Sequence, residues 1–327
     1  MKRYIKPHAL LVLLCFGLSG WKPCRAEGAK ESISKGLQYL EESGKRWKEK
    51  RGCVSCHQIP PMIWAMNLAL NAGIGGVTTT QVNQWTEWST DYVNFVKPPQ
   101  KATCDPKETM TANLDTMAGL LLAIPPTGAS DWRRRFTEHL VDQQADDGSW
   151  NPCGQLPAQK RKIEETTLAT TLWIANCLEN EDYDYQRSRV AQKLDALNTV
   201  QTAEILSLQI LLSDHYSEID RDEVLDSLLN SQNEDGGWGW RLDQQSDALG
   251  TGLALYALTQ VDSKRSEVIQ KAAVDARKFL ISTQEADGKW LVPGTKKSAQ
   301  GRPTQTANDW GTAWAVIALI EEPSTKD

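Results

Sequence analysis

A seven-residue pattern, Gln-x-x-Asp-Gly-x-Trp, occurs three times in this chain and constrains its fold more than any other feature. Each copy follows an amphipathic stretch, and Asp-Gly predicts a turn because Gly accepts a positive φ and Asp hydrogen-bonds to the local backbone. We expect structural roles for the Gln amides and Trp rings, which would connect neighbouring repeats. The three copies contain Gln144, Asp147, Gly148 and Trp150; Gln232, Asp235, Gly236 and Trp238; and Gln284, Asp287, Gly288 and Trp290.

Amphipathic stretches alternate along the chain with stretches that are apolar on nearly every side. The amphipathic ones are 31–43, 80–96, 131–144, 187–197, 218–232 and 265–284, and the apolar ones are 61–72, 111–124, 164–178, 199–212, 246–259 and 307–320. Helices that are apolar all round are buried, so six of each kind predict an all-α (α/α)6 toroid, with six inner helices inside six outer ones. We expect one toroid domain over 27–327. The alternative is a c-type cytochrome domain over 27–125, suggested by the segment Cys53-Val54-Ser55-Cys56-His57, followed by a half-toroid. It would break this alternation.

Residues 1–26 have the features of a secretory signal peptide. They combine a basic start, an apolar run from Ala9 to Leu18, and small residues suited to cleavage near Ala26. The run is too short to anchor the chain, and no later segment is apolar enough to cross a bilayer. We therefore expect an exported protein, periplasmic or extracellular, that is not an integral membrane protein. Residues 1–26 carry five of the 36 Lys and Arg and none of the 42 Asp and Glu, which leaves a net charge of −11 and disfavours nucleic acid as a partner.

The segment Cys53-Val54-Ser55-Cys56-His57 matches the attachment signature of a c-type haem. The thiols of Cys53 and Cys56 would add to the porphyrin vinyl groups, and the His57 imidazole would ligate the iron. A local disulfide and half of a zinc site are the alternatives. A disulfide does not explain the histidine, and a zinc site normally needs four ligands.

The sixth ligand of such a haem iron is open from the sequence. Met110 and His139 are the candidates, and an open coordination position is an equal alternative. Met62 and Met66 are less favoured because they are so close to the motif in sequence.

The three cysteines after this segment have two predicted roles. Cys104 and Cys153 lie in equivalent connections of adjacent repeats, so a disulfide between them would join two long loops. Cys177 lies in an apolar stretch and is expected to be an inert core thiol.

The three turns are similar to the QW repeats of squalene–hopene cyclases and protein prenyltransferase β subunits. The stretch Ser246 to Leu258 looks like an inner helix of that superfamily. The chain resembles in particular exported bacterial squalene-cyclase-like proteins that carry Cys-x-x-Cys-His near the start. This resemblance implies the fold of the terpenoid cyclase/prenyltransferase toroid. It is much weaker as an indication of an activity, because one fold supports many functions.

The catalytic residues of those families do not carry over. The Asp-x-Asp-Asp-Thr acid cluster of the cyclases is absent from the sequence, and Asp115 has no acidic neighbour. Asp247 stands near the position of the prenyltransferase zinc ligand, but Leu249 stands where the Cys is expected, and no His follows Asp309. We therefore expect neither the cyclase acid cluster nor a zinc site.

Three functions follow as hypotheses, and they leave open whether the chain is an enzyme. The first is an exported toroid carrying one covalent haem c for electron transfer or for sensing or processing a small molecule, with a redox partner or a small apolar ligand. The second is a lipid- or isoprenoid-handling cyclase-like enzyme or binding protein that uses the toroid cavity. The third is a binding module without chemistry, in which Cys53 and Cys56 are only structural.

Overall fold

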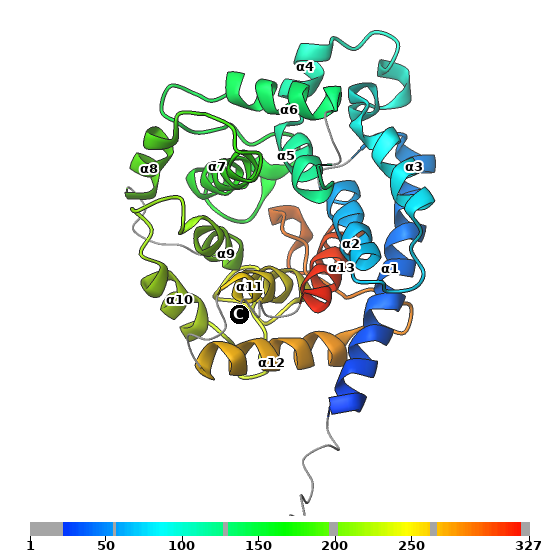
Figure 1. Cartoon of the computed structure of the whole chain (residues 1–327), viewed down its shortest axis with the longest axis vertical. Coiled ribbons are helices and arrows are strands. Elements are labelled where there is room, and N and C mark those ends of the chain that lie inside the picture. The colour runs from blue at the N-terminus through cyan, green and yellow to red at the C-terminus, as the bar shows by residue number, and fades with distance from the viewer. Residues whose placement is uncertain (1–21, 55–56, 127–129, 196–201, 262–266, 322–327) are drawn as a thin grey trace, which may run out of the picture.

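The computed structural model describes residues 22–54, 57–126, 130–195, 202–261 and 267–321. Within these residues the chain is helical, and its β-pairing is limited to isolated bridges. Figure 1 shows an outer ring of helices around an inner ring. The outer helices are α1 (Lys22–Arg51), α3 (Thr79–Thr90), α6 (Asp131–Asp142), α8 (Arg187–Asp195), α10 (Arg221–Asn230) and α12 (Glu267–Thr283). The inner helices are α2 (Ile59–Asn71), α5 (Leu114–Ala123), α7 (Ile163–Asn180), α9 (Ala203–Leu212), α11 (Ala248–Gln260) and α13 (Gln305–Ile320). The predicted α/α toroid is confirmed.

The connections between these helices contain several short elements. They are α4 (Pro106–Thr111) and the 3-10 segments η1 (Tyr92–Phe95), η2 (Pro98–Gln100), η3 (Leu156–Ala158) and η5 (Lys297–Ala299). The predicted inner helix 111–124 therefore needs correction, because Thr111 ends α4 and the inner helix begins at Leu114. Asp105 explains the separate helix, since its side chain accepts a hydrogen bond from the Glu108 N–H at 3.0 Å and caps α4. The predicted signal peptide lies mostly outside the described residues.

The three repeat turns have the same hydrogen bonds. Each Trp ring is fully buried and donates from Nε1 to a carbonyl of its own outer helix: Trp150 to Leu140 at 2.6 Å, Trp238 to Leu228 at 2.8 Å, and Trp290 to Leu280 at 2.8 Å. Each Gln amide closes its turn by donating to the Gly carbonyl: Gln144 to Gly148 at 3.0 Å, Gln232 to Gly236 at 2.7 Å, and Gln284 to Gly288 at 2.9 Å. These bonds tie each turn to the outer helix that precedes it.

The last turn closes the ring by contacting the first helix. Gln284 Nε2 donates to the Ser32 carbonyl of α1 at 2.9 Å. The corresponding Gln232 donates to the Ala272 carbonyl of α12 at 3.0 Å, so the closing contact repeats an internal one. A second contact joins α13 to α1: the Asp309 carboxylate of α13 accepts hydrogen bonds from Tyr39 (2.9 Å) and Ser43 (2.7 Å) of α1. The two ends of the described chain are thus held together by polar contacts.

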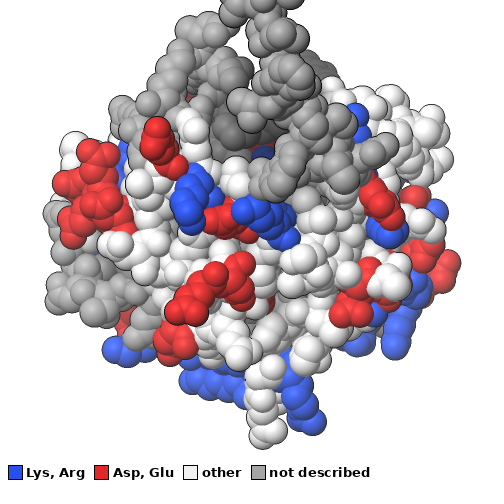
Figure 2. All heavy atoms as spheres, turned by 90° about the horizontal axis from the view of Figure 1, so that it is seen from below, with Lys and Arg blue, Asp and Glu red and all other residues white. Residues whose placement is uncertain are grey.

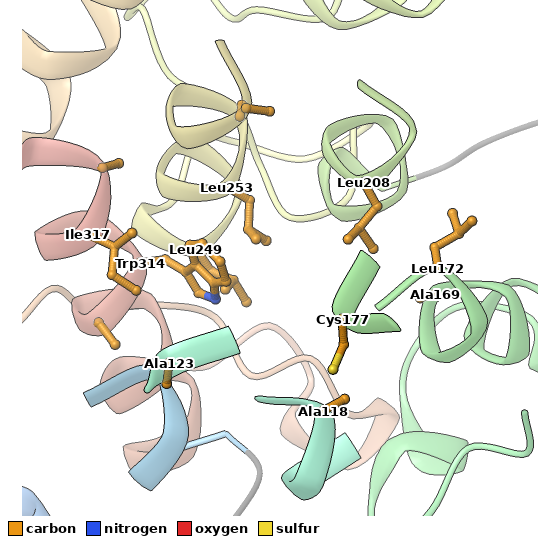
Figure 3. Packing of buried hydrophobic residues seen from close by; sticks show 14 of the residues in the cluster. Ala118, Ala123, Ala169, Leu172, Cys177, Leu208, Leu249, Leu253, Trp314 and Ile317 are labelled. Carbon is orange, nitrogen blue, oxygen red and sulfur yellow. The ribbon is translucent and has the colours of Figure 1, made fainter. Parts of the chain in front are cut away.

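The core lies between the inner helices, which bury side chains on nearly every side. Figure 3 shows Leu249 and Leu253 of α11 beside Trp314 and Ile317 of α13. Cys177 of α7 is fully buried there, and burial raises the pKa of its thiol, so its predicted role as a core thiol agrees with the structure.

The outer surface carries both signs of charge. On the face shown in Figure 2, Lys and Arg side chains are intermingled with Asp and Glu side chains. Among the described helices, none has the length and apolarity needed to span a bilayer.

Candidate functional site

A cavity lies between five of the inner helices, α2, α5, α7, α9 and α13. Its water-accessible volume is about 110 Å³, well above the roughly 10–15 Å³ that one water molecule requires. Two rim segments, 155–161 before α7 and 295–296 before α13, complete the wall. They contact each other, because the Lys160 N–H donates to the Thr295 carbonyl at 2.8 Å and Lys296 hydrogen-bonds to Gln155.

One part of the cavity wall is aromatic. Trp64, Trp173, Trp310 and Trp314 all line it. The Trp314 ring packs against the Trp64 ring with centroids 5.4 Å apart and against the Trp173 ring at 5.5 Å. Rings in edge-to-face and tilted contact form a stiff, apolar surface that suits an apolar ligand.

An adjoining part of the wall is polar and centres on Glu204 of α9. Arg161 Nη1 lies 2.8 Å from Glu204 Oε2, and both side chains are buried. Two indoles also donate to the same carboxylate, Trp173 at 2.8 Å and Trp240 at 3.3 Å. Three donors from different parts of the chain hold this side chain, so this part of the wall is fixed in place.

Asp115 of α5 lines the same cavity. Burial raises the pKa of its carboxyl to about 6, against the effect of hydrogen bonds from Thr170 and from the Cys153 N–H, and the charge of Glu204 raises it further. Asp115 is therefore about half protonated near pH 6, and its carboxylate predominates above pH 7. Two acids from different repeats thus meet in the cavity, which the sequence analysis missed. The available signal was that each is the one acid in its apolar stretch, 111–124 or 199–212.

His57 of the Cys-x-x-Cys-His segment also lines this cavity. Its ring contacts Trp47 edge-on at 5.7 Å, and Trp47 Nε1 donates to the Cys53 carbonyl at 2.7 Å. Burial, and then the nearby Lys296, lower the pKa of His57 to about 4, so its imidazole is neutral at physiological pH. Cys53 is a half-buried thiol, and Cys56 lies outside the described residues.

The structure does not bring the candidate sixth ligands to this cavity. Met110 on α4 and His139 on α6 are buried away from the cavity wall. His139 Nε2 lies 3.1 Å from Thr111 Oγ1, so its ring is already engaged. Met62 and Met66 are buried core residues of α2.

Cys104 and Cys153 are free thiols, and the predicted disulfide between them is not formed in the structure. The Cys104 thiol lies 3.5 Å from the Lys101 carbonyl, while the Cys153 thiol lies 3.3 Å from the Thr111 carbonyl. Each thiol therefore donates to a different part of the backbone.

Over the described part of the chain, no three His, Cys, Asp or Glu side chains are grouped to hold a metal ion. A c-type haem needs only one or two protein ligands on its iron, so this does not bear on the haem prediction.

Asp247 and Asp309, the acids compared above with the prenyltransferase zinc ligands, have structural roles here. Asp247 is the N-cap of α11, and its carboxylate accepts hydrogen bonds from the backbone N–H groups of Leu249, Gly250 and Trp240 at 2.8–2.9 Å. Asp309 forms the contact between α13 and α1 described above. Neither residue lines the cavity.

The fold defines an α/α toroid built around a central cavity. No protein-family model and no curated protein sequence matches the chain. Among solved structures, it is similar to type II terpene cyclase MstE from Scytonema in complex with its product merosterolic acid A, with a TM-score of 0.55 and 12% identity over 91% of this chain and 98% of that one.

It is equally similar to glycan-degrading enzymes. The unsaturated glucuronyl hydrolase from Bacillus sp. GL1 matches with a TM-score of 0.57 and 12% identity over 90% of this chain and 95% of that one. An unsaturated glucuronyl hydrolase specific for heparin matches with a TM-score of 0.57 and 10% identity, over 90% and 96%. Two enzyme classes on one architecture establish the fold and leave the activity to the site itself.

Proposed function

We propose that this protein is an exported, squalene-cyclase-like toroid that carries a c-type haem at the edge of a cavity for a small apolar molecule. The haem would be attached to Cys53 and Cys56, with His57 on its iron. The observation that carries this proposal is that His57, the ligand expected from the motif, lines the aromatic cavity. Export, to the periplasm or the outside of the cell, is supported by residues 1–26.

The described residues fit the group chemically. An iron ligand must be an unprotonated imidazole, and the lowered pKa of His57 keeps it so. Thioether formation needs a free thiol, and Cys53 is one. A haem held here would supply one-electron redox chemistry beside the cavity. The protein would contribute a water-excluding aromatic wall and a polar wall that orients the bound molecule, and a redox partner would exchange electrons with the haem.

The test is whether haem becomes covalently attached to the protein. The full-length protein is co-expressed with a haem-attachment system, and we expect a pyridine haemochrome spectrum of a c-type haem and a haem-staining band after denaturing electrophoresis. The double variant Cys53→Ala, Cys56→Ala should lose both signals and remain helical, because most of the toroid lies outside the motif. Cys104→Ala serves as the control thiol and should keep the haem. A haem-free wild type, or haem retained by the double variant, contradicts the proposal.

A second candidate is an isoprenoid-handling enzyme or binding protein without haem. It is favoured by the four tryptophans and by Asp115, an acid with a raised pKa, in one cavity, and MstE, on a similar fold, was solved with geranylgeranyl dihydroxybenzoate. Mass analysis of extracts after incubation with such prenylated substrates tests it. A cyclic product that is lost in Asp115→Asn would favour this candidate over the first.

A further inference from the structure

We propose that the central cavity binds an uncharged apolar molecule that ends in a hydroxyl group. The hydroxyl would lie at Gln159 and Arg161, and the apolar body between Trp64, Trp173 and Trp314. This inference rests on the cavity being the binding site, as in the proposed function, and does not depend on the haem.

Unpaired polar atoms on the cavity-lining residues carry the argument. Gln159 Oε1, Arg161 Nε and Trp314 Nε1 are buried and have no hydrogen-bond partner. All three residues line the cavity, and each is at most 4% exposed. A buried donor or acceptor without a partner is costly, and such groups in native proteins usually pair with a ligand or an ordered water. The cavity wall therefore offers two donors and one amide to a bound molecule.

The local backbone places the first two of these side chains together. Gln159 has extended backbone angles (φ −66°, ψ 163°) and forms an isolated antiparallel bridge with Lys296. Arg161 follows two residues later in the same rim segment, and both residues line the cavity. One hydroxyl can accept from the Arg161 guanidinium and donate to the Gln159 amide. Because a hydroxyl both donates and accepts, it pairs with that amide in either orientation.

The charges of the wall exclude an ionic end group. The positive charge of Arg161 is already paired with Glu204 at 2.8 Å. Asp115 and Lys296, the other two formally charged side chains of the lining, are also of opposite sign, so a carboxylate or phosphate would leave an unbalanced negative charge in a buried site, which is costly. An ammonium group would offer no acceptor to the two unpaired donors, Arg161 Nε and Trp314 Nε1. A neutral hydroxyl avoids both problems.

The test compares three ligands with the same ten-carbon isoprenoid skeleton: the alcohol geraniol, its acid as the geranate anion, and the hydrocarbon 2,6-dimethyl-2,6-octadiene. Binding is measured by calorimetry at pH 7.5 on the purified full-length protein, produced with and without a haem-attachment system. We expect geraniol to bind at least about tenfold more tightly than the other two, because it alone provides the two hydrogen bonds without a charge.

Gln159→Met isolates the hydrogen bond. It should reduce geraniol binding to the level of the hydrocarbon and leave hydrocarbon binding unchanged within about twofold, since the apolar contacts remain. The folded state should not suffer, because the change removes an unpaired buried acceptor, and circular dichroism checks this. Gln260→Met, the same change at the exposed end of α11, is the matched control and should keep the preference for geraniol.

The outcomes separate this inference from the haem proposal. Selective geraniol binding in either preparation supports it, even if no haemochrome is found. Equal binding of alcohol and hydrocarbon, tighter binding of geranate, a preference that survives Gln159→Met, or no binding of any of the three in both preparations overturns it. In the last case only water pairs with these atoms.

Discussion

Asp115 shows how a single residue acquires its chemistry from distant parts of the chain. In sequence it is an isolated acid in an apolar stretch, yet in the toroid it shares a cavity wall with Glu204 and receives a hydrogen bond from Thr170. Burial makes its charged form costly, which raises its pKa to about 6. Asp247, the acid that the family resemblance pointed to, is instead used to cap a helix.

This raised pKa predicts a pH dependence of stability. The folded-state pKa of Asp115, about 6, lies above the ordinary value of 3.8, so the folded protein keeps this proton up to a higher pH than the unfolded chain does. The stabilisation is complete below about pH 4 and is lost as the pH rises through about 6, by up to about 3 kcal/mol. In Asp115→Asn the free energy of unfolding should lack this contribution, so the difference between wild type and variant should shrink as the pH rises through about 6. Urea unfolding at pH 4, 5, 6 and 7 measures the difference between variant and wild type.

The control is Asp146→Asn, an exposed acid beside a repeat turn. Its difference from wild type should stay nearly constant over the same pH range. A constant difference for Asp115→Asn as well would show that Asp115 is not protonated in the fold.

At the scale of an element, the repeat turn depends on glycine for two separate reasons. Gly148, Gly236 and Gly288 have φ of +84°, +86° and +88°. Each also lies against the backbone of the next outer helix: a Cβ on Gly236 would be 2.9 Å from Asp275 atoms of α12, and one on Gly288 would be 2.3 Å from the Lys35 carbonyl oxygen of α1. The turn is therefore also the contact between neighbouring repeats.

Alanine substitutions separate these two reasons. Gly154 has a φ of +59° with nothing within 4 Å of a Cβ, so Gly154→Ala should cost only the conformational term, about 1 kcal/mol. Gly236→Ala adds the clash with α12 and should cost about 1–3 kcal/mol more. Urea unfolding of both variants measures this. Equal losses would mean that the backbone contact contributes nothing.

At the scale of the whole molecule, the ring is held closed where the last helix meets the first. Asp309 of α13 is buried, which raises its pKa, and it accepts from Tyr39 and Ser43 of α1 and from Gln305 Nε2 at 2.8 Å. The closing turn adds the bond from Gln284 to Ser32. The contacts with Tyr39, Ser43 and Ser32 of α1 join residues more than 250 positions apart, so they fix the ring in a way that no local interaction can.

Tyr39→Phe tests this closure. It removes a hydroxyl that donates to Asp309 and accepts from Gln305 (2.8 Å), and leaves the buried carboxyl with one donor fewer. We expect a loss of about 1–3 kcal/mol in the free energy of unfolding and faster amide hydrogen exchange in α1 and α13. Tyr92→Phe, a half-buried tyrosine on the outer side of the ring, should have little effect on exchange there. Unchanged exchange in Tyr39→Phe would show that the ring is closed by apolar packing alone.

The sequence by itself determined the architecture. The alternation of amphipathic and apolar stretches and the three Gln-x-x-Asp-Gly-x-Trp turns are local patterns, and a local pattern fixes helix type, burial and turn geometry. That is why the inner and outer helices could be predicted, with α4 missed because one capping residue, Asp105, starts a helix that periodicity merges with the next. The structural roles of Trp150, Trp238 and Trp290 followed from the same local reasoning.

Only the tertiary structure decided which residues line the cavity. The wall is assembled from five inner helices and two rim segments, so His57, Asp115, Arg161 and Glu204 become neighbours through ring closure and not through sequence spacing. For the same reason Met110 and His139, which fit the haem by residue type, lie elsewhere in the fold. A motif specifies which atoms can react, whereas burial and long-range packing decide which of them meet and in which protonation state.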